Sequence, residues 1–290
     1  MVWQVTREAP GGAGECGVSG SSPRLMGILN VTPDSFSDGG EFFSVESALE
    51  HALALLDEGA EILDVGGEST RPGAEPVPQE EEQRRVLPAI RAVLDARPGT
   101  KISVDTYHAQ TAEAALEEGA SIVNDVTALR GDERMASVVA GAGCEVVLMH
   151  MLGEPRTMQR DPRYEDVVRE VRDFLRERVD YAVGCGIDPG RIILDPGIGF
   201  GKTVEHNLEL LRRLDEICEL GFPVLVGTSR KRFIGTITGV QTPKERLFGT
   251  VATTVLAYER GASIFRVHDV RANREALDVA RMLLIGERGG

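Results

Sequence analysis

Short apolar runs alternate with longer amphipathic stretches from Arg24 to near the end of the chain. The runs are rich in β-branched residues and have the length of strands; they lie at 25–29, 61–65, 101–104, 121–123, 145–149, 191–194, 223–226 and 263–267. Between them, apolar residues recur at helical spacing, for example at Val168, Val171, Leu175, Val179 and Ala182, and again at Leu208, Leu211 and Leu214. The pattern predicts eight strands separated by helices.

A glycine ends six of the helical stretches just before the next strand: Gly59, Gly119, Gly143, Gly186, Gly221 and Gly261. Glycine at this place supplies the left-handed residue that ends a helix. Eight strand–helix units without a strand-rich or helix-rich block predict an α/β fold, a closed (β/α)8 TIM barrel. The alternative is a doubly wound open sheet, which usually has a glycine-rich turn after its first strand. Here the first run leads into Asn30-Val31-Thr32 instead.

We expect one barrel domain over 24–290, preceded by a flexible arm over 1–23. The arm is rich in glycine and serine and lacks the basic stretch and apolar core of a signal peptide. No apolar run in the chain approaches the roughly 18 residues that a membrane span needs. The four cysteines, Cys16, Cys144, Cys185 and Cys218, have no CxxC spacing, so neither a zinc site nor a disulfide scaffold is indicated. Such cysteine usage favours the cytoplasm.

The charge of the chain limits its partners. Its 290 residues carry a formal net charge of −14, from 46 acidic against 32 basic side chains. A broad contact with nucleic acid or with an anionic membrane is therefore not expected. Any anionic ligand must be held by a local basic cluster.

Polar or charged side chains stand near or just after the end of every predicted strand, whereas the rest of each strand is mainly apolar. They include Asn30, Asp64, Asp105, Asn124, His150, Asp195, Ser229, Lys231, Arg266 and His268. Strand ends are often polar simply because they approach solvent. In a barrel, however, these ends meet on one rim, where active sites of this fold lie. Because polar side chains occur at the ends of all eight predicted strands, a functional site on this rim is favoured over chance.

The residue types on this rim sort into two groups. Asp105, Asn124 and Asp195 could bind the donors and acceptors of a flat heterocycle. Arg71, Arg266 and His268 could hold an anionic leaving group such as a phosphate, and Lys231 could serve either group. Asn30 could give its carbonyl oxygen to Mg²⁺, which prefers oxygen ligands and often bridges substrate phosphates. The long loops after the first two strands carry Asp34, Phe36 and Arg71, and such rim loops are typically functional lids.

The stretch GIGFGKT at 197–203 looks like a phosphate-binding P-loop. That motif needs a glycine five positions before the glycine of its GK pair, and Pro196 stands there. We therefore reject nucleoside triphosphate binding at this stretch. It remains a glycine-rich turn from a strand to a helix that a ligand can approach closely, with Phe200 beside the ligand.

Longer motifs along the chain resemble the dihydropteroate synthase family of pterin-binding barrels. They are GILNVTPDSFSDGG at 27–40, DVGGESTRPG at 64–73, SVDT at 103–106, ND at 124–125, DPGIGFGKT at 195–203, SRK at 229–231 and RVHDV at 266–270. The first two are highly specific, and the shorter ones add weight because all of them occur in order. The resemblance runs from about Leu25 to near the C-terminus.

The resemblance implies an enzyme of folate biosynthesis that joins a dihydropterin hydroxymethyl diphosphate to 4-aminobenzoate and releases diphosphate with the help of Mg²⁺. It also implies a sulfonamide target and a homodimer packed through late barrel helices. By the motifs that match, the resemblance implies that the pterin is bound by Asp105, Asn124, Asp195 and Lys231, with Phe200 and Ser229 beside the substrates. It implies that the diphosphate region is served by Thr70, Arg71, Arg266 and His268. Asp34 would face the reacting centre, and Asn30 would bind the metal. Arg232 stands where some members have a small hydroxyl residue that touches the benzoate carboxylate; it could make that contact with charge or point away.

Two other functions are compatible with parts of this pattern. A methyltransferase that moves a methyl group from a tetrahydropterin to a corrinoid protein would share Asp105, Asn124 and Asp195. It needs no diphosphate site, so Arg71 and the pair of Arg266 and His268 favour the synthase. A non-catalytic pterin-binding relative would have eroded lids, whereas both lid sequences are complete here.

Overall fold

Eight parallel strands form a closed ring in the computed structural model, which describes residues 22–32, 45–68, 77–153 and 157–285. The strands are β1 (Arg24–Asn30), β2 (Ile62–Gly66), β3 (Lys101–Asp105), β4 (Ile122–Asp125), β5 (Glu145–Met149), β6 (Ile192–Asp195), β7 (Leu225–Val226) and β8 (Ile264–Val267). Hydrogen-bonded neighbours follow the order β6-β5-β4-β3-β2-β1-β8-β7, and a parallel bridge between Leu194 and Val224 joins the two ends. The predicted barrel is confirmed, and the open sheet is wrong.

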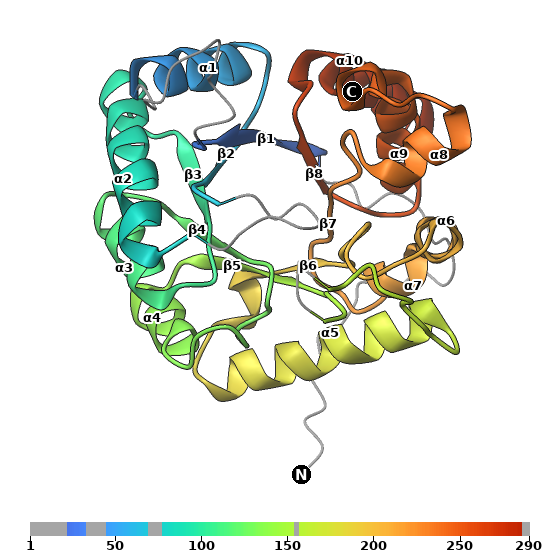
Figure 1. The fold of residues 1–290 in the computed structure, drawn as a ribbon, viewed down its shortest axis with the longest axis horizontal. Helices are drawn as coiled ribbons and strands as arrows, with labels where there is room; N and C mark the ends of the chain where they lie inside the picture. Colours follow the sequence, from blue (N-terminus) through green and yellow to red (C-terminus); the bar gives the residue numbers. More distant parts are fainter. Residues whose placement is uncertain (1–21, 33–44, 69–76, 154–156, 286–290) are drawn as a thin grey trace.

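Helices surround the ring on its outer side (Figure 1). They are α1 (Val45–Asp57), α2 (Gln79–Ala96), α3 (Ala109–Glu117), α4 (Met135–Ala142), α5 (Val167–Gly184), α6 (Val204–Arg212), α7 (Asp215–Cys218), α8 (Arg232–Thr238), α9 (Leu247–Glu259) and α10 (Val270–Ile285), with short 3-10 turns at Pro189–Arg191 and Pro243–Glu245. No helix in the described ranges is long and apolar enough to cross a membrane. The expected arm lies outside the described residues except for Ser22 and Pro23.

The strands bury side chains on both faces. The outward residues and the helices form one large apolar core, while a separate layer fills the bottom of the ring: Met26, Ile62, Ile122, Val147, Ile193, Leu225 and Ile264. This second layer, called the floor below, excludes water from the barrel axis. Because it is closed, only the carboxyl end of the ring is available for polar chemistry.

The helical patterns were predicted well on α5 and less well on α6. All five apolar residues of the predicted α5 stripe are buried. On α6 the predicted stripe is wrong in detail, because the helix ends at Arg212, before Leu214, and its buried positions are Asn207 and Leu210. Asn207 faces inward because its side chain hydrogen bonds the backbone of the preceding turn. The six predicted helix-ending glycines all have positive φ, as expected for left-handed caps.

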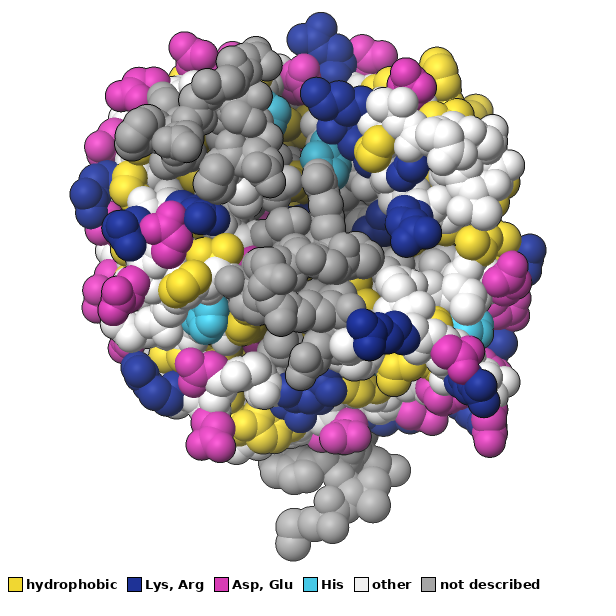
Figure 2. All heavy atoms as spheres, in the orientation of Figure 1, with side chains coloured by type: hydrophobic (Ala, Val, Ile, Leu, Met, Phe, Trp, Pro, Cys, Tyr) yellow, Lys and Arg dark blue, Asp and Glu magenta, His cyan; other side chains and the backbone are white. Residues whose placement is uncertain are grey.

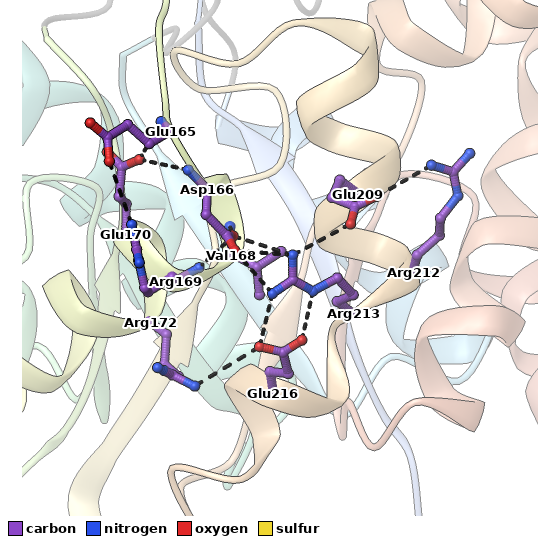
Figure 3. Close-up of polar contacts among 10 residues, drawn as sticks. All are labelled: Glu165, Asp166, Val168, Arg169, Glu170, Arg172, Glu209, Arg212, Arg213 and Glu216. Carbon is purple, nitrogen blue, oxygen red and sulfur yellow. Dashed lines mark hydrogen bonds and ion pairs between the residues drawn. The ribbon is translucent and has the colours of Figure 1, made fainter.

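A network of ion pairs fixes the start of α5 against α6 and α7 (Figure 3). Asp166 caps α5 by accepting the backbone N–H groups of Val168 and Arg169, each at 3.0 Å. Arg213 lies 3.3 Å from the Asp166 carboxylate and 2.6 Å from that of Glu216. Partly exposed pairs are individually weak, but here one guanidinium joins three helices. The network thereby holds the helix that follows the glycine-rich turn.

Candidate active site

The upper part of the barrel interior is polar. Asp64, Asn124, Asp195 and Arg266 each follow a floor isoleucine by two positions on the same strand. Side chains two residues apart on a strand point to the same face, so these four lie inside the barrel above the floor. Asp105 lies at the same level because it pairs with Asn124 in the register of β3 and β4.

Arg266 connects the carboxylates of this interior group. Its Nε lies 2.6 Å from Oδ2 of Asp64, and its Nη2 lies 2.8 Å from Oδ2 of Asp105. Asn124 donates from Nδ2 to the same Asp64 oxygen at 3.1 Å. Asp64 and Asp105 are 0% and 8% exposed, so the carboxylates of both ion pairs are largely shielded from water. The predicted ring-binding residues Asp105 and Asn124 are thus brought together, and Arg266 lies with them.

Burial moves the pKa values of Asp105 and Lys231 toward neutral pH. It raises the pKa of Asp105 to about 7, against the attraction of Arg266, and the negative charge of Asp64 raises it further. It lowers the pKa of Lys231 to about 8, which the carboxylate of Asp195 opposes. The pKa of Asp195 is itself raised by burial. Perturbed pKa values of this kind are typical of a functional site.

The glycine-rich turn over 197–201, between β6 and α6, lies against Lys231. The Lys231 amine donates to the Ile198 carbonyl and lies 4.5 Å from the centre of the Phe200 ring. Gly197 N–H donates to Oδ1 of Asp195 at 2.7 Å. The predicted turn is confirmed, and it brings Phe200 and Lys231 to the edge of the interior group.

The ends of β7 and β8 form a second cluster beside this group. Oγ of Ser229 lies 2.9 Å from Nδ1 of His268, and the His268 N–H donates to the same hydroxyl at 3.1 Å. Arg230 forms an ion pair with Asp269.

Charged side chains are unevenly distributed over the face of the molecule that looks along the ring (Figure 2). Acidic side chains lie mainly toward the edge of this face, and Lys and Arg side chains lie on several sides of its middle.

Several predicted site residues have no described position. Asp34, Thr70 and Arg71, with the lid residue Phe36, lie outside the described residues. Asn30 ends β1 on the rim and is half-buried. In the described ranges, no group of three or more His, Cys, Asp or Glu side chains is placed to hold a metal ion. A metal at Asn30 would therefore need further oxygen ligands from substrate or water.

Comparison with known proteins agrees with this geometry. Residues 26–268 match the family described as pterin binding enzyme. A dihydropteroate synthase of Synechocystis sp. is 48% identical over 264 residues, which are 91% of each chain. The chain belongs to the dihydropteroate synthase family.

Solved structures of this family have the same fold. The dihydropteroate synthase of Xanthomonas albilineans with 4-aminobenzoic acid is 50% identical, with a TM-score of 0.86 over 91% of this chain and 94% of the other. A structure of the Xanthomonas albilineans enzyme with 7,8-dihydropteroate gives a TM-score of 0.83 and 47% identity over 91% and 95% of the two chains. Because the relatives are synthases, the corrinoid methyltransferase and the non-catalytic relative are disfavoured for this member of the family.

Two buried residues of this synthase-family site were missed from sequence. Asp64 stands at a predicted strand end without a predicted role, although it holds both Asn124 and Arg266. Lys202 lies in the stretch that does not fit a P-loop and has no predicted role either, yet its amine is buried beneath the turn. Only the two-residue spacing from Ile62 to Asp64 could have placed the first inside the barrel. Arg232 begins α8 and is exposed.

Proposed function

We propose that the protein condenses (7,8-dihydropterin-6-yl)methyl diphosphate with 4-aminobenzoate to give 7,8-dihydropteroate and diphosphate. The observation that carries this proposal is the group formed by the buried Asp105, Asn124 and Asp195 with the half-buried Lys231 and Arg266, above an apolar floor. A pterin ring offers adjacent N–H donors and a carbonyl on one flat edge. Carboxylates, an amide and an amine gathered above the floor complement such an edge.

Each of these side chains has a proposed task. The carboxylate of Asp105 accepts from ring N–H groups, and Asn124 both donates and accepts. Asp195 accepts from the opposite end of the ring, while Lys231 donates to a ring acceptor and Phe200 packs on a ring face. Arg266 holds Asp105 at 2.8 Å and so fixes the orientation of that carboxylate. This arrangement supports Arg266 as part of the ring site.

The reaction is a substitution at the carbon that links the pterin to the diphosphate. The carbon–oxygen bond breaks, and diphosphate leaves with the bonding electrons. The amine of 4-aminobenzoate then forms the new carbon–nitrogen bond and loses a proton. The pterin ring can delocalise the positive charge that develops, so we propose a dissociative path in which position matters more than amine deprotonation. Ser229 and His268 lie at the rim to bind the leaving group, together with Thr70 and Arg71 of the second loop, while Asp34 stabilises the cation and the loops exclude water.

We propose that Mg²⁺ takes part and that Asn30 holds it. Asn30 fits a metal because its half-buried side chain on the rim has no hydrogen-bond partner among the described residues. Mg²⁺ usually takes one or two protein ligands and completes its shell with phosphate oxygens and water. When bound, the ion would neutralise charge that develops on diphosphate. Asn30 itself supplies one carbonyl oxygen at a fixed place on the rim.

We also propose a homodimer that packs through α9 and α10. These helices pack together and leave large apolar side chains exposed: Phe248 at 86%, Leu256 at 57%, Val279 at 62%, Met282 at 49% and Leu283 at 79%. Apolar patches of this kind often mark contacts between proteins. The three on α10 share one helix face by their spacing. For its location we propose the cytoplasm, because Cys144 and Cys185 form no disulfide within the described residues.

Lys231→Ala tests the ring site, with Lys244→Ala as its control. Lys244 is an exposed lysine in the short turn at Pro243–Glu245. Loss of one charge-assisted hydrogen bond corresponds to about 1.5–3 kcal/mol, so the KM for the pterin diphosphate should rise about 10- to 100-fold in Lys231→Ala. Steady-state kinetics should show Lys244→Ala unchanged, and circular dichroism should show both variants folded. Equal kinetics for the two variants would remove Lys231 from the site.

A further inference from the structure

The glycine-rich turn over 197–201 supplies two of the contacts that orient Lys231, namely the Ile198 carbonyl and the Phe200 ring. Its backbone is unusual, because Gly197, Gly199 and Gly201 all have positive φ. Three left-handed residues within five positions do not form a self-supporting helix or strand. One backbone hydrogen bond lies within the turn, from the Phe200 N–H to the Gly197 carbonyl at 3.0 Å, and side chains outside the turn supply further contacts to it.

Lys202 is the residue that closes this turn. Its Nζ donates to the carbonyl of Gly197 at 2.9 Å and to that of Phe200 at 3.0 Å. It also lies 2.9 Å from Nδ1 of His150 at the end of β5. The Lys202 side chain is buried, at 3% exposure. One amine thus ties the first residue of the turn, the fourth residue and the neighbouring strand together.

The three groups nearest this amine, at 2.9 to 3.0 Å, are all able to accept; the His150 carbonyl is a fourth acceptor, at 3.5 Å. The two carbonyl oxygens can only accept, and burial lowers the pKa of His150 to about 2, so that ring stays neutral and keeps an acceptor nitrogen. An ammonium has three protons for these three acceptors. Burial lowers the pKa of Lys202 as well, and the nearby carboxylate of Asp195 opposes that shift. The buried Lys202 amine therefore hydrogen bonds backbone carbonyls rather than solvent.

Other buried or half-buried groups support the same turn from outside. Oδ1 of Asn207 accepts from the Gly199 N–H at 2.6 Å, and the Tyr164 hydroxyl donates to the Gly201 carbonyl at 2.8 Å. Lys202 differs from these in its reach, because it holds both the start and the end of the segment that contacts Lys231. Loss of Asn207 or Tyr164 would release one peptide, whereas loss of Lys202 would release two and the contact with β5.

We infer that Lys202 is a positioning residue, which acts through the turn to set the Ile198 carbonyl and the Phe200 ring against Lys231 and so determines pterin affinity. The inference rests on the proposed function for its ligand. Among the described residues, the Lys202 amine hydrogen bonds the turn and His150 and no side chain of the interior group; its charge acts on Asp195 only through space. Its effect should therefore appear in pterin binding and not in the KM for 4-aminobenzoate.

The test compares Lys202→Met, Lys202→Gln and Arg178→Met. Arg178 is the matched control, because it is also a buried cation that donates to a loop carbonyl, that of Ala128 at 2.8 Å, away from the turn. Binding of 6-hydroxymethyl-7,8-dihydropterin is measured by calorimetry and the KM for each substrate by kinetics. Misplacement of a binding group by about 1 Å can weaken function 100-fold, so we expect about a tenfold or greater loss of pterin affinity in Lys202→Met. Arg178→Met should bind as the wild type does.

Lys202→Gln keeps two donors without a buried charge, so its pterin affinity should lie between those of the wild type and Lys202→Met. It also carries the test if Lys202→Met does not fold. The inference is overturned if Lys202→Gln binds pterin as tightly as the wild type, or if Arg178→Met loses as much pterin affinity as Lys202→Met. It is also overturned if Lys202→Met raises the KM for 4-aminobenzoate as much as the KM for the pterin diphosphate.

A spectroscopic measurement separates this inference from the proposed function. The chain has five histidines, so the ring nitrogens of His150 can be resolved by 15N-histidine labelling and assigned with His150→Gln. In Lys202→Met, the Nδ1 resonance should move to the position of a nitrogen that accepts no hydrogen bond. An unchanged resonance would overturn the inference. Wild-type protein that binds no pterin would instead refute the proposed function, since the resonance needs no ligand.

Discussion

Gly197→Ala offers a quantitative test of how tightly the glycine-rich turn is built. A Cβ at this residue would lie 1.8 Å from the carbonyl oxygen of His150, and its φ is +67°. Gly143 is a matched control, because its φ is +62° and no atom lies within 4 Å of its Cβ position. The left-handed conformation alone should cost alanine about 1–2 kcal/mol in both variants. The contact with His150 arises only at Gly197.

The clash at Gly197 adds a second cost. A carbon and an oxygen need about 3 Å or more, so the turn or β5 must move by about 1 Å, and such overpacking typically costs about 1–3 kcal/mol. We expect Gly197→Ala to lose about 2–5 kcal/mol in the free energy of unfolding and Gly143→Ala about 1–2 kcal/mol. Each kcal/mol corresponds to about 2–4 °C in Tm for a chain of this size.

Thermal unfolding followed by circular dichroism gives the Tm difference, and calorimetry with 6-hydroxymethyl-7,8-dihydropterin gives the binding change. The turn contacts Lys231, so Gly197→Ala should also lose pterin affinity while Gly143→Ala keeps it. Equal Tm values for the two variants, or wild-type pterin affinity in Gly197→Ala, would refute the reasoning about the turn.

Three further outcomes follow from the site. The negative charge of Asp64 raises the pKa of Asp105, so Asp64→Asn should lower that pKa. Because the pterin is proposed to bind to ionised Asp105, the rise of kcat/KM with pH near pH 7 should move to lower pH in this variant. A pH profile whose rise does not move would contradict this. Sulfonamides should compete with 4-aminobenzoate and not with the pterin in steady-state inhibition, whereas competition with the pterin alone would argue against a benzoate site. Chelation by EDTA should abolish turnover and Mg²⁺ should restore it, with Asn30→Ala needing more Mg²⁺ than the wild type; full activity in EDTA would remove the metal from the proposal.

The fold could be predicted from the sequence because its signals are local and repeated. Strand-length apolar runs, helical spacing and the glycine before each next strand agree along the whole chain, and all six glycines adopt the expected conformation. The α6 stripe failed because a polar contact overrode the apolar pattern: Asn207 turns inward to hold the Gly199 N–H. The spacing of apolar residues along a helix does not predict such a hydrogen bond.

The site could be predicted only in part. Strand ends pointed to Asp105, Asn124 and Asp195, which the barrel gathers into its interior. The sequence could not show that Arg266 pairs with both Asp64 and Asp105, because those residues lie 202 and 161 positions away. Pairing at that distance depends on the last strand, β8, lying beside the first strand, β1, in the ring. Lys202 was missed because two of its partners are backbone carbonyls, which no residue type reveals, and the third is the ring of His150, 52 positions away.

The most direct test is to incubate the purified protein with Mg²⁺, (7,8-dihydropterin-6-yl)methyl diphosphate and 4-aminobenzoate. Mass spectrometry should then show 7,8-dihydropteroate, and a coupled assay should show diphosphate in equal amount. Omission of 4-aminobenzoate should stop formation of dihydropteroate. Folded wild-type protein that forms no dihydropteroate under these conditions would contradict the proposed function.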